Sequence, residues 1–397
     1  MANIMPDHLK SQPLISRKEK VHEQAKVPAW VTVALLPAIN VLVAFLVSAL
    51  LFMYIDINPI DAAKVMWTGA FGYAEGFGYT MYYATGFIFT GLAVAVAFHA
   101  GLFNIGGEGQ AYIGGLGVGL ICLTLGEYAP WYIVFPVAIV VGGLFGAAWA
   151  FIPAYLQAKR GSHIVITTIM FNFIASSLMA YLLVDILKPE TTMATESRVF
   201  AASSWLPKMH EILAVVEIEM APSPMNLSFI FALLCCVFVW LLMWHSRWGY
   251  EIRSVGSNPS AANYAGIKYV KIIILTMLIS GMLAGFFGLN VLQGELHQIK
   301  LNFVEGFGFT GIAVALMGRN HPVGVLLASL LFGFLYQGGA ELSFEYGVDR
   351  NIVVVLQGLV ILFSGALEHM FRPSLERTYL KLFGKKQAEQ QAEKGVA

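Results

Sequence analysis

Residues 101–115 read Gly-Leu-Phe-Asn-Ile-Gly-Gly-Glu-Gly-Gln-Ala-Tyr-Ile-Gly-Gly and lie between two apolar runs, with no soluble linker on either side. The stretch places the carboxylate of Glu108 among glycines, with Asn104 and Gln110 close by. An ionisable group at membrane depth is costly unless it is paired or hydrated, and glycines let the backbone break and other backbones approach closely. We therefore expect a broken membrane helix, in which Glu108 is either a polar hinge that lines a path or a structural carboxylate that accepts backbone N–H bonds.

The composition is that of an integral membrane protein. Of the 397 residues, 58% are apolar and only 12% are charged, whereas soluble domains carry about 25% charged residues. Lys plus Arg and Asp plus Glu number 24 each, so the net charge gives no sign of a nucleic-acid partner, and none is expected. The three cysteines lie inside apolar runs, where they indicate small core residues rather than a disulfide framework.

Apolar runs long enough to cross a bilayer recur along the whole chain. A spanning helix needs about 20 apolar residues. The fold class we predict is an all-α polytopic membrane protein with about ten transmembrane helices. The candidate spans are 28–54, 79–99, 109–125, 130–155, 163–187, 226–245, 271–292, 303–318, 322–337 and 351–367. The pair 303–318 and 322–337 is short and could instead form a re-entrant pair.

The distribution of Lys and Arg predicts the orientation. With a cytoplasmic N-terminus, 18 of the 24 basic residues fall on the cytoplasmic side, as the positive-inside rule requires. Both termini are then cytoplasmic. We expect a cytoplasmic lead at 1–26, a transmembrane domain at 27–370 and a cytoplasmic tail at 371–397. Within the transmembrane domain, 188–225 is predicted to be an extracytoplasmic loop and 246–270 a cytoplasmic loop.

The chain contains an internal repeat. Gly-Phe-Ile-Phe-Thr-Gly-Leu-Ala-Val-Ala at 86–95 matches Gly-Phe-Gly-Phe-Thr-Gly-Ile-Ala-Val-Ala at 306–315, with eight of ten positions identical. By the span order both copies run from outside to inside, which favours a parallel duplication. Transporters are often built from such repeats, with the path near the repeat interface. Glu108 follows the first copy, at the predicted inner end of a span, and the second copy has no acid there.

The 246–270 loop contains a short helix with clear ends. Asn258 is a good N-cap and Pro259 suits the first helical position. Gly266 suits the stop, so the helix is predicted at 258–265. A helix of about two turns is marginal alone in water. It is therefore either an ordinary helical turn in a loop or an element that docks into a partner's groove.

Taken together, these motifs resemble one family. Gly-Leu-Phe-Asn-Ile-Gly-x-Glu-Gly-Gln at 101–110, the Gly-x-x-x-Arg-x-Val-Gly-x-Asn-x-x-Ala-Ala-x-x-x-Gly-Ile pattern at 249–267 and the repeat at 306–324 are similar to permease subunits of ATP-binding-cassette (ABC) importers. The branch is the one that serves simple sugars, nucleosides and branched-chain amino acids. The chain looks most like the longer permease of nucleoside importers, and the resemblance covers roughly residues 30–370.

The resemblance implies roles for two groups of residues. The 246–270 loop would couple to the ATPase through its short helix, with Arg253, Gly256, Asn258, Ala261, Ala262 and Gly266 as the coupling residues. The glycine-rich stretch would be a signature hinge of Asn104, Gly106, Glu108, Gly109 and Gln110.

The resemblance also implies partners and a location. The partners are an ATP-binding subunit, a second permease that is homologous or identical, an extracytoplasmic substrate-binding protein and the lipid bilayer. The protein would be a multi-pass protein of the bacterial inner membrane. No cofactor is expected in this chain, because ATP and Mg²⁺ would bind the partner subunit.

Two other classes of function have less support in the sequence. The chain has no Gly-x4-Gly-Lys-[Ser/Thr] motif, so P-loop ATP hydrolysis needs a separate subunit. A secondary transporter or channel would use intramembrane charges, and beyond Glu108 the acids Asp185, Glu295 and Glu305 all fall near span ends. An intramembrane enzyme has little support, since His210-Glu211 lacks the second histidine of a His-Glu-x-x-His site.

The substrate is predicted to be a nucleoside, or else a simple sugar. Either needs amides, hydroxyls and aromatic rings along the path. Side chains of these types occur within the spans, and the substrate-path candidates are Asn172, Phe171, Thr168, Gln337 and Asn290. Polar side chains in membrane helices commonly bond to one another across helices, so each could also be structural.

Overall fold

A computed structural model describes residues 36–347, except 191–192, 215–216 and 218–219, and a few positions between 349 and 362. The predicted lead at 1–26 and tail at 371–397 lie outside the described residues. The chain forms two compact units, 1–50 with 359–397, and 51–358. Of the described helices, the first unit contains most of α2 and the second contains all the others.

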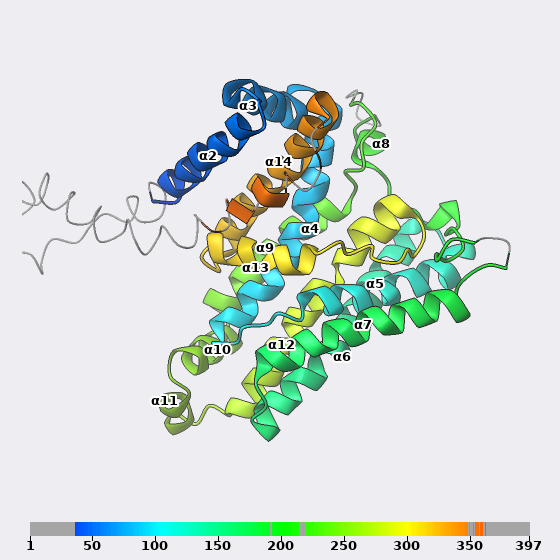
Figure 1. Ribbon diagram of the computed structural model, residues 1–397. Helices are drawn as coiled ribbons and strands as arrows, with labels where there is room; N and C mark the ends of the chain where they lie inside the picture. The colour runs from blue at the N-terminus through cyan, green and yellow to red at the C-terminus, as the bar shows by residue number, and fades with distance from the viewer. Residues whose placement is uncertain are drawn as a thin grey trace, which may run out of the picture. The chain divides into compact units, whose positions relative to one another are not determined.

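The described part of the chain is built from helices, with two isolated β-bridges and no strand. Figure 1 shows their order along the chain. The helices are α2 (Leu36–Tyr54), α3 (Pro59–Trp67), the π-helix η3 (Thr68–Gly72), α4 (Ala74–His99), α5 (Gly107–Thr124), the 3-10 helix η4 (Leu125–Glu127), α6 (Trp131–Arg160), α7 (Ile164–Asp185), the 3-10 helix η5 (Ala202–Ser204), α8 (Met209–Ala214), α9 (Ser228–His245), α10 (Arg247–Ser257), α11 (Pro259–Tyr264), α12 (Tyr269–Gly285), the π-helix η6 (Leu289–Leu296), α13 (Phe307–Met317) and α14 (Pro322–Tyr346).

The polytopic membrane fold is confirmed, with some differences in the spans. Within the described residues, seven helices are long and apolar enough to cross a membrane, and α2 with the α3–η3 stretch makes one bent further candidate. The predicted span 303–318 holds only the 11 residues of α13. At about 1.5 Å per residue this helix is too short to cross a hydrocarbon core of about 30 Å. The span predicted at 351–367 lies largely outside the described residues.

The two copies of the repeat pack against each other. The α4 residues Gly86 and Gly91 lie against Phe307 and Val314 of α13. Residue numbers rise together along the contact, so the two helices are parallel, as the sequence predicted. The rings of Phe87 and Phe307 stack with centroids 4.4 Å apart. The long helix α14 packs beside both of them.

Glycine pairs bring other helices into close contact. α12 packs on α6, which in turn packs on α5, and these helices lie side by side in Figure 1. A Cβ added to Gly146 would lie 2.2 Å from the carbonyl oxygen of Gly281, and one added to Gly285 would lie 2.5 Å from that of Gly142. The Gly-x-x-x-Gly spacings therefore serve close packing within this chain.

Candidate functional site

A polar cavity lies beside the irregular stretch between α12 and α13. Its volume is about 380 Å³, within the usual range for small-molecule sites. Aromatic rings make up much of its wall, and amide and charged side chains complete it. The lining side chains include Tyr79, Tyr82, Tyr83, Phe287, Phe303, Phe307, Asn290, Asn302, Glu295, Lys300 and Glu305.

The backbone that walls the cavity departs from regular helix. α12 ends at Gly285 and is followed by the π-helix η6. His297, Asn302 and Glu305 then have φ of 54°, 59° and 47°, the left-handed region that non-glycine residues rarely adopt. Non-helical backbone at membrane depth is tolerated where it is packed in protein or lines a cavity, and strained residues of this kind cluster at functional sites.

Glu108 of α5 binds the backbone of the segment that walls the cavity. Gly306 N donates to Glu108 Oε1 (2.9 Å) and Gly308 N donates to Glu108 Oε2 (2.8 Å). The carboxylate therefore caps the N-terminus of α13 while it lies in the first turn of its own helix, α5. Two helix N-termini converge on one anion, and each favours negative charge through its free N–H groups and its dipole. The structural reading of Glu108, as an acceptor of backbone N–H bonds, fits this geometry.

The depth of Glu108 differs from the prediction. Its partner Gly306 precedes the first turn of α13, which packs beside Gly86 and Phe87, and Gly86 is the thirteenth of the 26 residues of α4. Glu108 thus lies level with the middle of α4 and not at its inner end. The prediction was wrong because residues 100–106, which follow α4, turn back along the helix before α5 begins.

The other residues of the signature hinge form a separate network. Asn104 Nδ2 donates to Gln110 Oε1 (3.0 Å) and to Ser280 Oγ (2.9 Å). Gly106 N donates to Asn104 Oδ1 (2.9 Å), and Gln110 Nε2 donates to the same oxygen (3.2 Å). Ser280 Oγ in turn donates to the carbonyl of Ala93 (2.6 Å). The two buried amides therefore fix the turn before α5 to α12 and α4.

Most substrate-path candidates bond to the protein itself. Asn172 accepts from Gly109 N (2.9 Å) and donates to Ile105 O (2.9 Å), so it holds the same turn. Thr168 donates to Ile164 O (2.8 Å), and the carbonyl of Phe171 accepts from Trp149 Nε1 (3.2 Å). None of these three lines the cavity.

The remaining two candidates differ from each other. Gln337 is buried, and its amide points toward the carbonyl of Gly69 (3.4 Å). Asn290 does line the cavity. Its Nδ2 donates to Tyr82 O (3.0 Å), and its Oδ1 accepts from Ser228 Oγ (3.0 Å). Asn290 is thus the one substrate-path candidate placed at the cavity wall, where it also ties α4 to η6.

The loop between α9 and α12 has the predicted caps. Asn258 Oδ1 accepts from Ala261 N (3.0 Å), and Gly266 has φ of 81°, so α11 begins and ends where the sequence predicted. Ala262 is buried, whereas Ala261 and Tyr264 are exposed, Tyr264 at 95%. The preceding helix α10 was not predicted. Its signal was Ser246 as N-cap, with Gly249, Ile252 and Val255 buried at a spacing of three.

Two of the coupling candidates pack against the membrane helices. The guanidinium of Arg253 lies 6.0 Å from the ring centre of Trp244, a cation–π contact. Gly256 lies directly on the end of α4, because an added Cβ would be 2.2 Å from His99 O and 2.9 Å from Gly101 N. This contact is made between backbones and leaves no room for a side chain.

Sequence reasoning missed most of the cavity. Tyr79, Tyr82 and Tyr83 stand near the start of a span, where tyrosine ordinarily indicates the membrane interface. Glu295 and Glu305 were noted only as acids near span ends. The available signal was the density of polar residues in 289–306, where a continuous span would be apolar.

Comparisons with known proteins agree with this architecture. The family described as the permease component of the branched-chain amino acid transport system matches residues 76–365. A guanosine ABC transporter permease of Bacillus subtilis is 36% identical over 334 residues, which cover 83% of this chain and 92% of the relative. A nucleoside ABC transporter permease of Lactococcus lactis is 33% identical over 342 residues, covering 83% and 90%.

Relatives are not restricted to nucleoside systems. A glucose ABC transporter permease of Haloferax volcanii is 32% identical over 341 residues, covering 85% of this chain and 88% of the relative. No solved structure matches the chain. The chain belongs to the branched-chain amino acid transport system permease family, and is therefore a membrane-spanning transport subunit of an ABC transporter.

Proposed function

We propose that the chain carries a nucleoside across the inner membrane, through the cavity between α4, η6 and α13. The observation that carries this proposal is the chemistry of the cavity wall. Tyr79, Tyr82 and Tyr83 offer rings on which a base can stack, and stacking on aromatic rings contributes about 1–3 kcal/mol per base. Asn302, Glu305 and Lys300 offer partners for ribose hydroxyls and base edges.

The energy source lies outside the chain. ABC permeases work with an ATP-binding partner and a substrate-binding partner. In this proposal ATP and Mg²⁺ bind only the ATP-binding subunit, and movement enters the permease at α10 and α11. The exposed face of α11, with Ala261 and Tyr264, supports docking into a groove of that subunit. Membership in the family leaves no basis for the secondary-transporter alternative.

The orientation of the complex follows from the charge distribution. The loop of α10 and α11 and both termini lie in the cytoplasm, while the loop of residues 186–227 between α7 and α9 (hereafter the α7–α9 loop) faces the binding protein. A second permease, identical or homologous, completes the complex. Labelling of single cysteines at Tyr264 and at Ala202 with an impermeant thiol reagent in intact cells tests this orientation, since only the second should react.

Uptake into vesicles tests the substrate. The complete complex is reconstituted in vesicles with the binding protein on the outside and ATP in the lumen, and uptake of radiolabelled guanosine, adenosine, ribose, glucose and leucine is compared. Nucleoside uptake is expected, and replacement of Tyr83 by Ala should reduce it at least about tenfold, whereas Tyr128→Ala at an exposed site should not. Glucose or ribose uptake without nucleoside uptake would contradict the substrate assignment.

The docking of α11 needs a separate test. Because Arg253 contacts Trp244, a change at Arg253 also disturbs packing within the chain. Ala261→Arg on the exposed face of α11 is the cleaner variant, with Ala261→Ser as its control. We expect Ala261→Arg and deletion of 258–265 to abolish co-purification with the ATP-binding subunit and transport, with membrane insertion intact. Normal transport in either variant would contradict the coupling role.

A further inference from the structure

One face of α5 carries the segment that walls the cavity. Glu108, Tyr112, Gly115 and Gly119 are spaced by four, three and four residues, so they line one side of the helix. We call these four residues the α5 stripe, and we call residues 299–308 the wall segment. Asn302, Phe303, Glu305 and Phe307 of the wall segment line the cavity.

Every residue of the α5 stripe contacts the wall segment. Glu108 accepts from Gly306 N and Gly308 N. Tyr112 OH donates to Asn302 Oδ1 (3.0 Å), and its ring stacks on Phe303 with centroids 5.0 Å apart.

The two glycines of the stripe make room for wall side chains. A Cβ added to Gly115 would lie 2.3 Å from the Phe303 ring, and one added to Gly119 would lie 2.4 Å from Ile299 Cδ1. The helix and the wall segment are therefore fitted together along three turns.

The beginning of α5 reaches the α10 helix. The lead-in to α5 starts at Gly101, and Gly256 of α10 packs on His99 and Gly101 through backbone atoms. Asn104 and Asn172 then fix the lead-in with six hydrogen bonds to neighbouring groups. Because these contacts are close and hydrogen-bonded, a displacement of α10 is transmitted to the start of α5.

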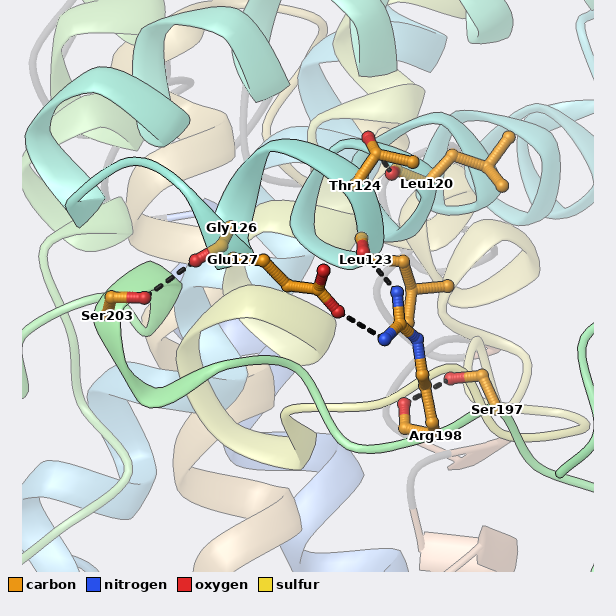
Figure 2. A network of polar contacts seen from close by, with 8 residues as sticks. All are labelled: Leu120, Leu123, Thr124, Gly126, Glu127, Ser197, Arg198 and Ser203. Atoms are coloured by element: carbon orange, nitrogen blue, oxygen red, sulfur yellow. Dashed lines mark hydrogen bonds and ion pairs between the residues drawn. The ribbon is translucent and has the colours of Figure 1, made fainter.

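The end of α5 reaches the α7–α9 loop. Figure 2 shows Arg198 of this loop, which donates to the carbonyl of Leu123 (2.6 Å) and pairs with Glu127. Ser203 Oγ donates to the carbonyl of Gly126 (2.6 Å). A cation and a hydroxyl therefore satisfy carbonyls at the C-terminal end of α5 and η4, where the helix dipole favours positive charge.

We propose that α5 is the element that moves the cavity wall when α10 moves, with Glu108 and Tyr112 as positioning residues that fix the wall segment to it. The inference rests on the proposed function in one respect, the entry of ATP-driven movement at α10. It adds the route, from Gly256 through the lead-in to the α5 stripe and the wall segment, and a second attachment at Arg198. A purely static role for Glu108 and Tyr112 makes a different prediction, since it leaves the wall's response to ATP unchanged.

Thiol labelling of the wall in the complete complex tests the route. Leu301 lines the cavity and is 38% exposed, so Leu301→Cys is the reporter. The chain without this substitution, whose native cysteines are buried, gives the background labelling. The labelling rate is measured with and without ATP and Mg²⁺ in the parent, in Tyr112→Phe and in Glu108→Gln. Tyr132→Phe on α6, 61% exposed, is the control for the tyrosine change.

The expected result is an ATP-dependent rate in the parent and in Tyr132→Phe. Tyr112→Phe keeps the ring stacking and loses one hydrogen bond, so we expect the ATP-dependent change to shrink about fivefold, and Glu108→Gln should lower it further. Thermal melts identify a variant that fails to fold, and Tyr112→Phe is chosen because its packing is intact.

Two results overturn the route. One is an ATP-dependent change that persists at full size in both Tyr112→Phe and Glu108→Gln, and the other is the absence of any ATP-dependent change in the parent. Failure of the proposed function looks different, because then no nucleoside enters the vesicles, with or without sugar uptake, while the wall still responds to ATP.

Discussion

The two copies of the repeat share eight of ten residues and yet form different structures. The first copy lies within the continuous helix α4, whereas the second begins a new helix, α13, after a turn. Gly86 is an ordinary helical residue packed against the rings of Phe287 and Phe307, while its counterpart Gly306 has φ of 82° and precedes the first turn. The same motif therefore continues a helix in one place and starts one in the other.

One of the two positions that differ helps to explain this. Ile88 of the first copy is fully buried. Its counterpart is Gly308, where an added Cβ would lie 2.2 Å from the amide nitrogen of Glu108 and 2.4 Å from its Cα. The second copy therefore has room for the start of α5 at this position because its residue here is glycine.

The largest expected effect comes from erasing this difference. Gly308→Ile leaves Ile312, opposite Leu92, as the one remaining difference between the copies, and it forces a branched side chain into the backbone of Glu108. Overpacking typically costs about 1–3 kcal/mol even where side chains can move, so we expect a loss above that range. The measurement is the temperature at which monodisperse protein is lost in size-exclusion chromatography.

The matched control for Gly308→Ile lies in the first copy. Ile88→Val should cost only about 0.5–1.5 kcal/mol. A Gly308→Ile protein as stable as Ile88→Val would show that the close approach of α5 and α13 is not needed.

Removal of the Glu108 carboxylate should destabilise only the second copy of the repeat, whose helix α13 it caps. Glu108→Ala leaves Gly306 N and Gly308 N without this acceptor, at a cost of at most about 1–3 kcal/mol for each group, because both bonds are only partly buried. Amide hydrogen exchange should accelerate at residues 306–309 and remain slow at 86–89. Glu345→Ala, at an exposed position of α14, is the control. Equal acceleration in both copies would mean that Glu108 supports the whole fold rather than the start of α13.

The first glycine of each copy, Gly86 or Gly306, has a different structural role, and substitutions at the two positions can tell these roles apart. Gly306→Ala meets no atom within 4 Å but must adopt a left-handed conformation, which costs about 1–2 kcal/mol. Gly86→Ala keeps its helical backbone and instead presses on the Phe287 ring, 2.9 Å away. Asn tolerates the left-handed region, so Gly306→Asn should recover stability in thermal melts while Gly86→Asn should be worse than Gly86→Ala. Recovery at both positions would refute the distinction.

The smallest expected effect is the pH dependence of stability around His297, which precedes the second copy. Burial, with the nearby charge of Lys208, lowers the pKa of His297 from 6.5 to about 4. The folded form thus binds the proton more weakly than the unfolded form, so stability is full above about pH 6.5 and falls as the pH drops toward 4. The ring is only half-buried, so solvent screening keeps the effect small.

Hydrogen exchange at 293–301, corrected for intrinsic rates, should therefore rise between about pH 7.5 and pH 5. Residues 74–85, which precede the first copy, should not change in this way. His297→Gln should remove the dependence. A dependence that survives this substitution would assign it to another group.

Local features were predictable from the sequence because their causes are local. Asn258, Pro259 and Gly266 define α11 through contacts within a few residues. The apolar runs predicted spanning helices for a similar reason.

The site was less predictable because its causes are distant in sequence. Glu108 finds its partners about 200 residues away, and no pattern around Glu108 indicates them. Asn104 and Gln110 belong to the same signature hinge as Glu108, yet they bond to each other, and Asn104 also bonds to Ser280. The cavity tyrosines belong to α4, while the groups that face them come from η6 and the wall segment, so only the fold brings them together.

The bond between Glu108 and Gly306 also has a consequence for the order of assembly during synthesis. The two residues are 198 positions apart, and a ribosome adds about 5–20 residues per second. The nascent chain therefore carries an acid destined for the membrane interior for roughly 10–40 s before the amides that donate to it exist. Until then the translocation machinery, water or a bound proton must shield the acid, and α5 reaches its final position only after α13 has been made.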